Sequence, residues 1–314
     1  MKSLIKILAV ALFLVSQFAY GSGSAGAFAR LGFGARGMGM GNAMSAVTDG
    51  AVSSYYNPAL SAFSQERTGS ATFGIMSLDR YLNFLNYTQS VQPHAGISVG
   101  LINSGVRNID GRDNDGVHTE DYSTTENQFF LSFSNRVDEH VALGVTVKMY
   151  YSKLFDQVTT TTVGFDLGAL VTPVDGLSIG LVAQDLNSKY KWDTKAIYDV
   201  NGKVTEDKFP TLYRLATAYQ IPGTKALVAG EFEHSSDKSN IIRLGAEYAF
   251  IENFSVRAGA DRWGLDDNTT GIKPTFGFSA RTSMNGLTPS VHYAYVVEGF
   301  APRGMHIITL SVGF

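Results

Sequence analysis

Hydrophobic and polar residues alternate along most of the chain after residue 68, and fourteen short segments show the period-2 pattern of β-strands. In one segment Ile242 and Leu244 alternate with Arg243. The gaps also alternate, because a turn of a few residues is usually followed by a longer polar loop. The predicted strands cover residues 69–78, 81–91, 95–103, 127–135, 140–151, 160–171, 176–186, 210–221, 225–234, 240–250, 253–262, 274–283, 287–297 and 304–314.

This spacing is typical of a transmembrane β-barrel with short turns on one side of an outer membrane and loops on the other. About ten residues at ~3.3 Å each, tilted by ~40°, span the ~25 Å apolar band. The longest predicted loops are residues 104–126 and 187–209. The sequence therefore predicts an all-β, 14-stranded antiparallel transmembrane β-barrel in the bacterial outer membrane, with lipid around its outer face.

The start of the chain has a different composition. Residues 1–21 read as a secretory signal peptide, with basic residues beside an apolar core and small residues before the cut. Residues 22–66 are rich in Gly, Ala, Ser and Met and lack alternation. Asn57 is suited to cap a helix, and Pro58 to occupy its first position. We expect these residues to form a plug in the mouth of the barrel formed by residues 67–314.

The alternation also assigns faces, since successive strand residues point to opposite sides of a barrel wall. The apolar set is predicted to face lipid and the polar set the lumen. Hairpin geometry places opposite charges across from one another on the lumen side, as cross-strand pairs prefer. We interpret this ladder as structural, with a ligand- or ion-selective lining as the alternative; its members are Arg214, Glu231, Arg243, Glu247, Arg257 and Arg281.

Several chemistries find little support in the sequence. A formal charge of −3 gives no basis for nucleic-acid binding, and the chain has no cysteine. No cofactor or metal site is predicted, because the six histidines are scattered. A hydrolase would need Ser, His and an orienting partner on one wall. Ser290 and His292 share a strand face, but two such residues on one strand of a Ser-rich chain are common by chance. We therefore expect no enzymatic activity, and we interpret the acidic residues of 104–126 as solvated rather than calcium-binding.

The N-terminal segment is similar to a known family. Residues 28–43 (FARLGFGARGMGMGNA), Val47-Thr48-Asp49-Gly50 and Tyr56-Asn57-Pro58-Ala59 resemble the PorV/PorQ family, which is related to FadL-like long-chain fatty-acid transporters. Leu60 departs from the glycine usual in that family. The final strand, which ends on Phe314, looks like the signal read by the outer-membrane assembly machinery.

The resemblance implies a plugged 14-stranded barrel with one of two roles. Our preferred interpretation is passive transport of small hydrophobic compounds. The alternative is an accessory of the type IX secretion system that engages secretion-system proteins through residues 104–126 and 187–209. Transport would use an apolar plug lined by Phe28, Leu31, Phe33, Met38, Met40 and Met44, and a lateral opening where pairing is weakened by Gly96, Gly100 and Gly105.

Overall fold

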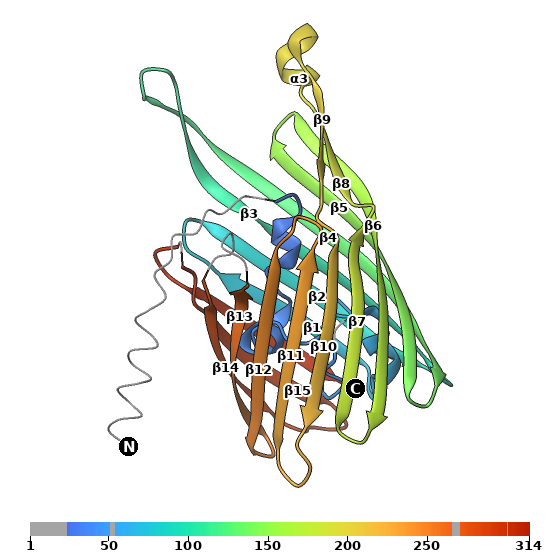
Figure 1. Ribbon diagram of the computed structural model, residues 1–314. Helices are drawn as coiled ribbons and strands as arrows, with labels where there is room; N and C mark the ends of the chain where they lie inside the picture. The colour runs from blue at the N-terminus through green and yellow to red at the C-terminus, as the bar shows by residue number, and fades with distance from the viewer. Residues whose placement is uncertain (1–23, 51–53, 266–270, 300) are drawn as a thin grey trace.

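Fourteen strands close into one antiparallel barrel, in which the first strand pairs with the last (Figure 1). This computed structural model describes residues 24–50, 54–265, 271–299 and 301–314. The predicted strand number and fold class are confirmed. The barrel strands are β1 (Thr68–Ile75), β2 (Arg80–Val91), β3 (Ala95–Arg112), β4 (His118–Asp138), β5 (Val141–Phe155), β6 (Val158–Val174), β7 (Leu177–Leu186), β10 (Leu212–Gln220), β11 (Ala226–Ser235), β12 (Asn240–Ile251), β13 (Phe254–Gly264), β14 (Lys273–Arg281), β15 (Thr288–Val296) and β16 (Met305–Gly313).

The two faces of the wall differ as the alternation predicts. In β5, Leu143 and Val147 are 51% and 45% exposed, whereas Thr146 and Lys148 are 1% exposed. In β12, Leu244 is exposed and its neighbour Arg243 is buried. An apolar outer face around a polar lining suits a barrel surrounded by lipid. Closure also pairs the backbone groups of the wall, which lipid cannot do.

The prediction that residues 104–126 form a loop is wrong. Strand β3 continues to Arg112 and β4 begins at His118, so that the two strands form a long hairpin with Asp110 opposite Asp121. Backbone pairing does not require apolar side chains. Both faces of this hairpin are largely exposed beyond the barrel, and the alternation that marks a half-buried strand is therefore absent.

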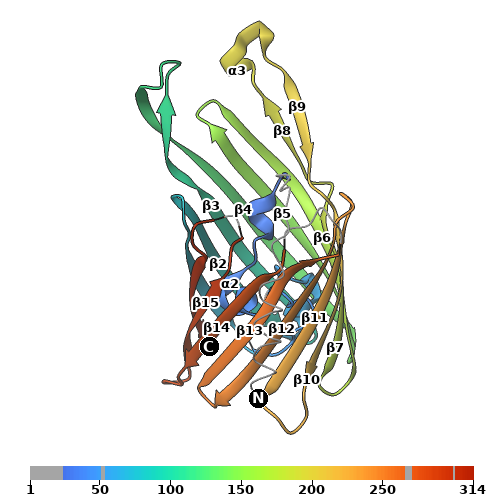
Figure 2. The same cartoon turned by 60° about the vertical axis from the view of Figure 1, so that its left-hand side comes forward.

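Residues 187–209 carry structure of their own. They contain the two-stranded hairpin β8 (Lys189–Asp193) and β9 (Val204–Lys208), with α3 (Lys195–Tyr198) and η3 (Asp199–Asn201) at its tip. Figure 2 shows this arm and the β3–β4 hairpin projecting from the same end of the barrel. We call this the arm end, and the opposite end, with its short connections, the turn end.

The described part of residues 22–66 lies inside the barrel. It contains η1 (Ala27–Arg30), α2 (Gly34–Gly39) and η2 (Pro58–Phe63). Helix α2 packs against β14, β15 and β16, and η2 against β2 to β6. The predicted helix start is present, because Asn57 accepts a hydrogen bond from the Ala59 amide at 3.0 Å and Pro58 follows it. The predicted signal peptide, residues 1–21, lies outside the described residues.

Across the described ranges, none of the helices is both long and apolar enough to cross a membrane.

Inward glycines of the wall form seats for the plug backbone. A Cβ atom at Gly168 would lie 2.1 Å from Asn57 Oδ1, and one at Gly144 would lie 2.4 Å from the Pro58 carbonyl carbon. The same holds on the other side, where a Cβ at Gly259 would meet the Gly41 amide at 2.3 Å. Only glycine permits this close approach of two backbones.

We expect Gly168→Val to displace the helix start at Asn57, because the new side chain fills the space that the plug occupies. Overpacking of this kind costs about 1–3 kcal/mol. On a gel, the temperature at which the fast-migrating folded band converts to the unfolded band should fall. The plug should also become accessible to protease. Gly69→Val, on β1 at a position without positive φ and with no described atom within 4 Å of its Cβ, tests the general effect of valine at a glycine site in the wall. Equal effects of both variants would contradict the seat.

Candidate functional site

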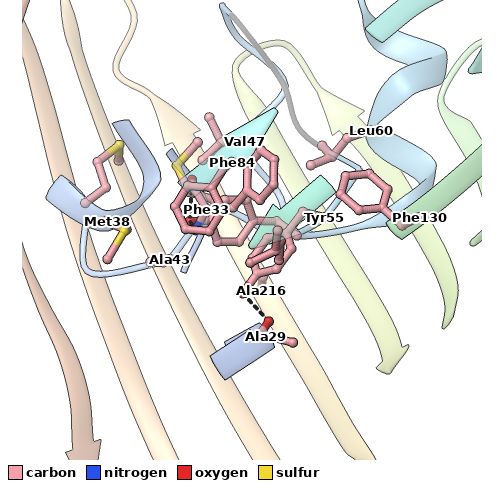
Figure 3. Packing of buried hydrophobic residues seen from close by; sticks show 14 of the residues in the cluster. Ala29, Phe33, Met38, Ala43, Val47, Tyr55, Leu60, Phe84, Phe130 and Ala216 are labelled. Carbon is pink, nitrogen blue, oxygen red and sulfur yellow. Dashed lines mark hydrogen bonds between the residues drawn. The ribbon is translucent and has the colours of Figure 1, made fainter. Parts of the chain in front are cut away.

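The centre of the plug is a cluster of aromatic and apolar side chains (Figure 3). The Phe33 ring centroid lies 5.0 Å from that of Tyr55 and 4.8 Å from that of Phe84 on β2. The Tyr55 hydroxyl donates to the Ala29 carbonyl at 2.8 Å. Aromatic contacts with wall strands therefore hold the middle of the plug across the bore.

The predicted lining residues belong to this apolar interior. Five of the six are at most 5% exposed, and Leu31 is half-buried against the cluster. Packing inside the plug is enough to explain where these residues lie. A role in ligand binding therefore stays a prediction. The five buried residues are Phe28, Phe33, Met38, Met40 and Met44.

Two pockets lie along the seam between plug and wall. A cavity of about 60 Å³ separates α2 from β1, β2, β15 and β16, and touches Phe33, Met44 and Tyr56 on the plug. Its wall side is polar, with Asn86, His292 and Ser311. A second pocket of about 300 Å³ opens at the turn end between plug residues 48–49 and the ends of β5, β6, β7, β10 and β11.

The charge ladder is present, with one change of partner. Arg214 lies opposite Glu233 in the register rather than opposite Glu231, and the corresponding Nε–Oε distances are 2.6 Å and 3.5 Å. Arg243 Nη1 lies 3.0 Å from both glutamates, and its Nε lies 2.8 Å from Asp261 Oδ1. All five groups are at most 6% exposed.

The ladder also anchors the plug. The Ser45 amide donates to Glu231 at 3.3 Å, and the Asn42 side chain donates to Asp261 at 3.3 Å. Further along the wall, Arg36 of α2 forms an ion pair with Glu247 at 2.8 Å. Glu247 is shared with Arg257, whose Nε lies 2.8 Å away.

Sequence reasoning missed three members of this network. Glu233 is two residues after Glu231 and shares its face, and the alternation could have identified it. Asp261 enters through a β-bulge beside Arg262, whose φ of 58° shifts the register. Arg36 comes from the plug, where no strand pattern applies. Arg281 is a correction: it is exposed, and its Nε donates to the Glu252 carbonyl instead of joining the ladder.

The wall is closed at the three glycines for which weak pairing was expected. Gly96, Gly100 and Gly105 all pair with β2 on one side and β4 on the other. A Cβ at Gly96 would lie 2.0 Å from the Ser61 carbonyl oxygen of the plug. These glycines therefore permit close packing here, and a lateral opening, which would require strand separation, stays a prediction.

Ser290 and His292 are brought together as their spacing suggests. Ser290 Oγ lies 3.0 Å from His292 Nε2, and both contact Ser311 Oγ, at 2.6 and 3.2 Å. His292 Nδ1 has no hydrogen-bond partner within the described part of the chain. The orienting group of a catalytic triad is therefore not in contact with this pair.

On the exposed β3–β4 hairpin, the side chains of Asp110, His118 and Asp121 converge, with ligand atoms within 4.8 Å of one another. His118 Nδ1 lies 2.7 Å from Asp110 Oδ1, and Arg112 binds the other oxygen of the same carboxylate at 2.6 Å. The arginine already compensates Asp110, so that we interpret the group as an ion-pair cluster across the hairpin.

Comparison with solved structures shows what this architecture resembles. The Pseudomonas putida toluene transporter TodX matches 90% of this chain and 97% of its own, with 13% identity and a TM-score of 0.64. A Pseudomonas aeruginosa FadL homologue matches 90% and 98%, with 12% identity and a TM-score of 0.62. The CymD monoaromatic hydrocarbon channel matches 90% and 97%, with 14% identity and a TM-score of 0.60.

The fold is that of the FadL-type channels. No family model matches the chain, and no curated protein matches it. The resemblance to PorV/PorQ proteins therefore has no support beyond the sequence motifs. At 12–14% identity the comparison fixes the barrel architecture and leaves the role of each side chain to be tested.

We expect Glu231→Ala to destabilise the barrel strongly. It removes one carboxylate between two buried arginines, and breaking a buried ion pair from one side costs about 3–5 kcal/mol. The temperature at which the folded species on a gel converts to the unfolded species should be clearly lower. The effect of the substitution on permeation should be smaller than its effect on stability. Glu139→Ala, in an exposed turn, is the matched control. Unchanged heat stability of Glu231→Ala would count against a structural ladder.

The His118–Asp110 pair predicts a pH dependence of the β3–β4 hairpin. The hydrogen bond with Asp110 raises the pKa of His118, and the same bond, with help from Arg112, lowers the pKa of Asp110. The pair is intact between the two pKa values. Its stabilisation is lost as pH rises through the raised pKa of His118, and also as pH falls through the lowered pKa of Asp110.

NMR titration of His118, with Asp110→Asn as the comparison, measures this dependence. The variant should return the pKa of His118 towards its ordinary value near 6.5. An identical titration in both proteins would show that the pair does not form.

Proposed function

We propose that this protein is a passive outer-membrane channel for small hydrophobic compounds. The observation that carries the proposal is an apolar plug cluster across the bore, adjacent to a cavity that touches Phe33, Met44 and Tyr56. The FadL-type fold supports it, because the similar structures include a toluene transporter and a monoaromatic hydrocarbon channel.

Passage in this proposal follows the seam between α2 and the wall. The cavity of about 60 Å³ is smaller than the ~150 Å³ of a site that holds benzene, so the seam has to widen. Met44 and the other plug methionines have flexible, polarisable side chains that adapt to apolar guests of varied shape. The ion pairs of Arg36 and the ladder keep the plug in the barrel while local side chains move.

Uptake by cells tests the proposal directly. Cells with and without the protein are given labelled toluene, alkane or fatty acid, and internal label is measured over time. The protein should accelerate uptake of at least one of these compounds and leave that of a labelled sugar unchanged. Equal uptake of all apolar probes in both strains would refute the proposal.

Phe33→Ala should widen the seam, because the ring fills the space between Tyr55, Phe84 and the cavity. Initial uptake of apolar probes should rise several-fold, while stability falls by about 3–5 kcal/mol from the lost core contacts. Phe165→Ala, which removes a ring 39% exposed on the outer face, is the matched control and should leave uptake unchanged. Equal uptake of the apolar probes by Phe33→Ala, Phe165→Ala and the parent protein would exclude the route along the seam between α2 and the wall.

The secretion-accessory alternative rests on the sequence resemblance alone. Its working surface would be the β3–β4 hairpin and the β8–β9 arm. Normal apolar uptake but lost protein export in cells lacking the protein would favour this alternative over a channel.

A further inference from the structure

The seam cavity between α2 and the wall has two chemically different sides. Phe33 and Met44 line it on the plug side. Hydroxyl, amide and imidazole groups line it on the wall side, from Ser70, Asn86, His292, Thr309 and Ser311. A pure hydrocarbon in this space would cover the polar side without replacing its hydrogen bonds to water, which costs free energy. A compound with an apolar body and one hydrogen-bonding group matches both sides.

Several polar groups around the cavity already have partners. The Tyr56 hydroxyl accepts from the Phe33 amide at 2.9 Å and donates to Asn42 Oδ1 at 2.7 Å. On the wall, Thr309 Oγ1 accepts from the Ala35 amide at 2.8 Å. These groups are used in holding the plug, so that a ligand has to be recognised by other atoms.

Two buried nitrogen atoms of the wall have no partner. His292 lines the cavity, and its Nδ1 makes no hydrogen bond with the described residues. Arg257 Nη1 likewise has no hydrogen-bond partner among them, although this side chain is only 2% exposed. Buried polar groups are normally paired, and each exception requires an explanation.

The two nitrogen atoms belong to side chains that lie close together along the seam. Arg257 packs against α2, because a Cβ at Gly39 would lie 3.1 Å from its Cδ. Its Nη2 donates to Ser279 Oγ at 2.9 Å, and Ser279 lies opposite His292 in the β14–β15 register. Among the charged groups that act on His292, Arg257 acts most strongly. One ligand atom between the two side chains would therefore satisfy both nitrogens.

The charge of the surroundings excludes one class of ligand. The charged residues that act on His292 are Arg257, Arg36 and Glu247. The two arginines share Glu247, at 2.8 Å each, so that two positive charges face one negative charge. An ammonium group brought to His292 would therefore be repelled.

A carboxylate is also a poor match. It binds arginine most strongly through two parallel hydrogen bonds. Glu247 occupies the Nε atoms of both arginines, and the other Arg36 nitrogens bind Glu247 and the Asp49 carbonyl. Because Ser279 occupies Nη2 of Arg257, only its Nη1 stays available for a new acceptor.

A single hydroxyl group fits these atoms. Its oxygen accepts from Arg257 Nη1, and the same group either donates to His292 Nδ1 or accepts from it, so that both tautomers of the imidazole are satisfied. An aromatic ring suits the plug side, because it packs against the Phe33 ring and the Met44 sulfur.

We propose that the seam cavity is a recognition site for small aromatic compounds that carry one hydroxyl group, such as phenols. The ring lies against Phe33 and Met44, and the hydroxyl group lies between His292 and Arg257. The inference rests on the proposed channel function and names its substrate class. Both nitrogens are covered in the closed seam, so that they receive the hydroxyl group as the seam widens.

Equilibrium dialysis of the full folded protein, with the same detergent on both sides, tests the site with four labelled probes. Toluene, 4-methylphenol, 4-methylbenzylamine and 4-methylbenzoate share a methylphenyl group and differ in their polar group. 4-Methylphenol should bind about tenfold more tightly than toluene or 4-methylbenzoate. 4-Methylbenzylamine should bind most weakly.

His292→Phe removes both ring nitrogens and keeps an aromatic ring. It should weaken binding of 4-methylphenol about tenfold and leave that of toluene unchanged. His306→Phe makes the same change at an exposed histidine on the outer face, and should affect neither probe.

The ranking of the four probes in the parent protein needs no substitution, and it keeps the test decisive if His292→Phe folds poorly. Ser311→Ala is a smaller change on the wall side of the cavity. It removes a hydroxyl group that lies 3.2 Å from His292 Nε2, and should weaken 4-methylphenol but not toluene. Folding of each variant is checked by its gel migration.

Three outcomes would overturn this inference. They are 4-methylphenol binding no tighter than toluene, tighter binding of the carboxylate or the amine than of 4-methylphenol, and an unchanged preference in folded His292→Phe. Toluene binding in any of these cases would leave the channel function intact. Absence of binding by all four probes would overturn the inference alone if the protein still accelerates cellular uptake, and the channel function as well if uptake is unchanged.

Discussion

Pairing of every backbone polar group in the wall is the constraint on which the rest of this structure depends. Lipid offers no hydrogen bonds, so that the fourteen strands close on themselves, with β1 paired to β16. Closure sends alternate side chains inward, away from the lipid. The plug fills that space, and its shape follows from the wall: glycines such as Gly144 and Gly168 admit its backbone, and Phe84 contacts its aromatic centre.

Two of the charge clusters inside the bore each lie at a β-bulge. One joins Arg243 to Asp261 beside Arg262, and the other joins Lys148 to Asp185. They differ in how completely their atoms are paired. The first binds plug residues Asn42 and Ser45 and therefore stabilises the closed barrel. Beside the second, both amide atoms of Gln128 and of Gln184 have no hydrogen-bond partner among the described residues.

The proposed passage of hydrophobic compounds needs apolar surface inside a polar-lined barrel, and the described plug residues provide such a surface. Phe33 and Met44 lie where the plug meets a small cavity on the wall. The ion pair of Arg36 with Glu247 secures α2 while leaving these side chains free of polar contacts. The plug is therefore attached to the wall by polar groups at its edge, while its apolar side chains pack inside the bore.

The sequence by itself determined the strand number, the lipid-facing residues, the helix start at Asn57 and most of the ladder, because these depend on local periodicity and capping. It misjudged residues 104–126, where strands leave the membrane and lose their alternation. Only the tertiary structure decided that Arg214 faces Glu233, that Asp261 and Asp185 turn inward, and that Arg36 joins the wall. Bulges and the docking of the plug depend on backbone register and on contacts between distant residues, neither of which a local pattern of side chains encodes.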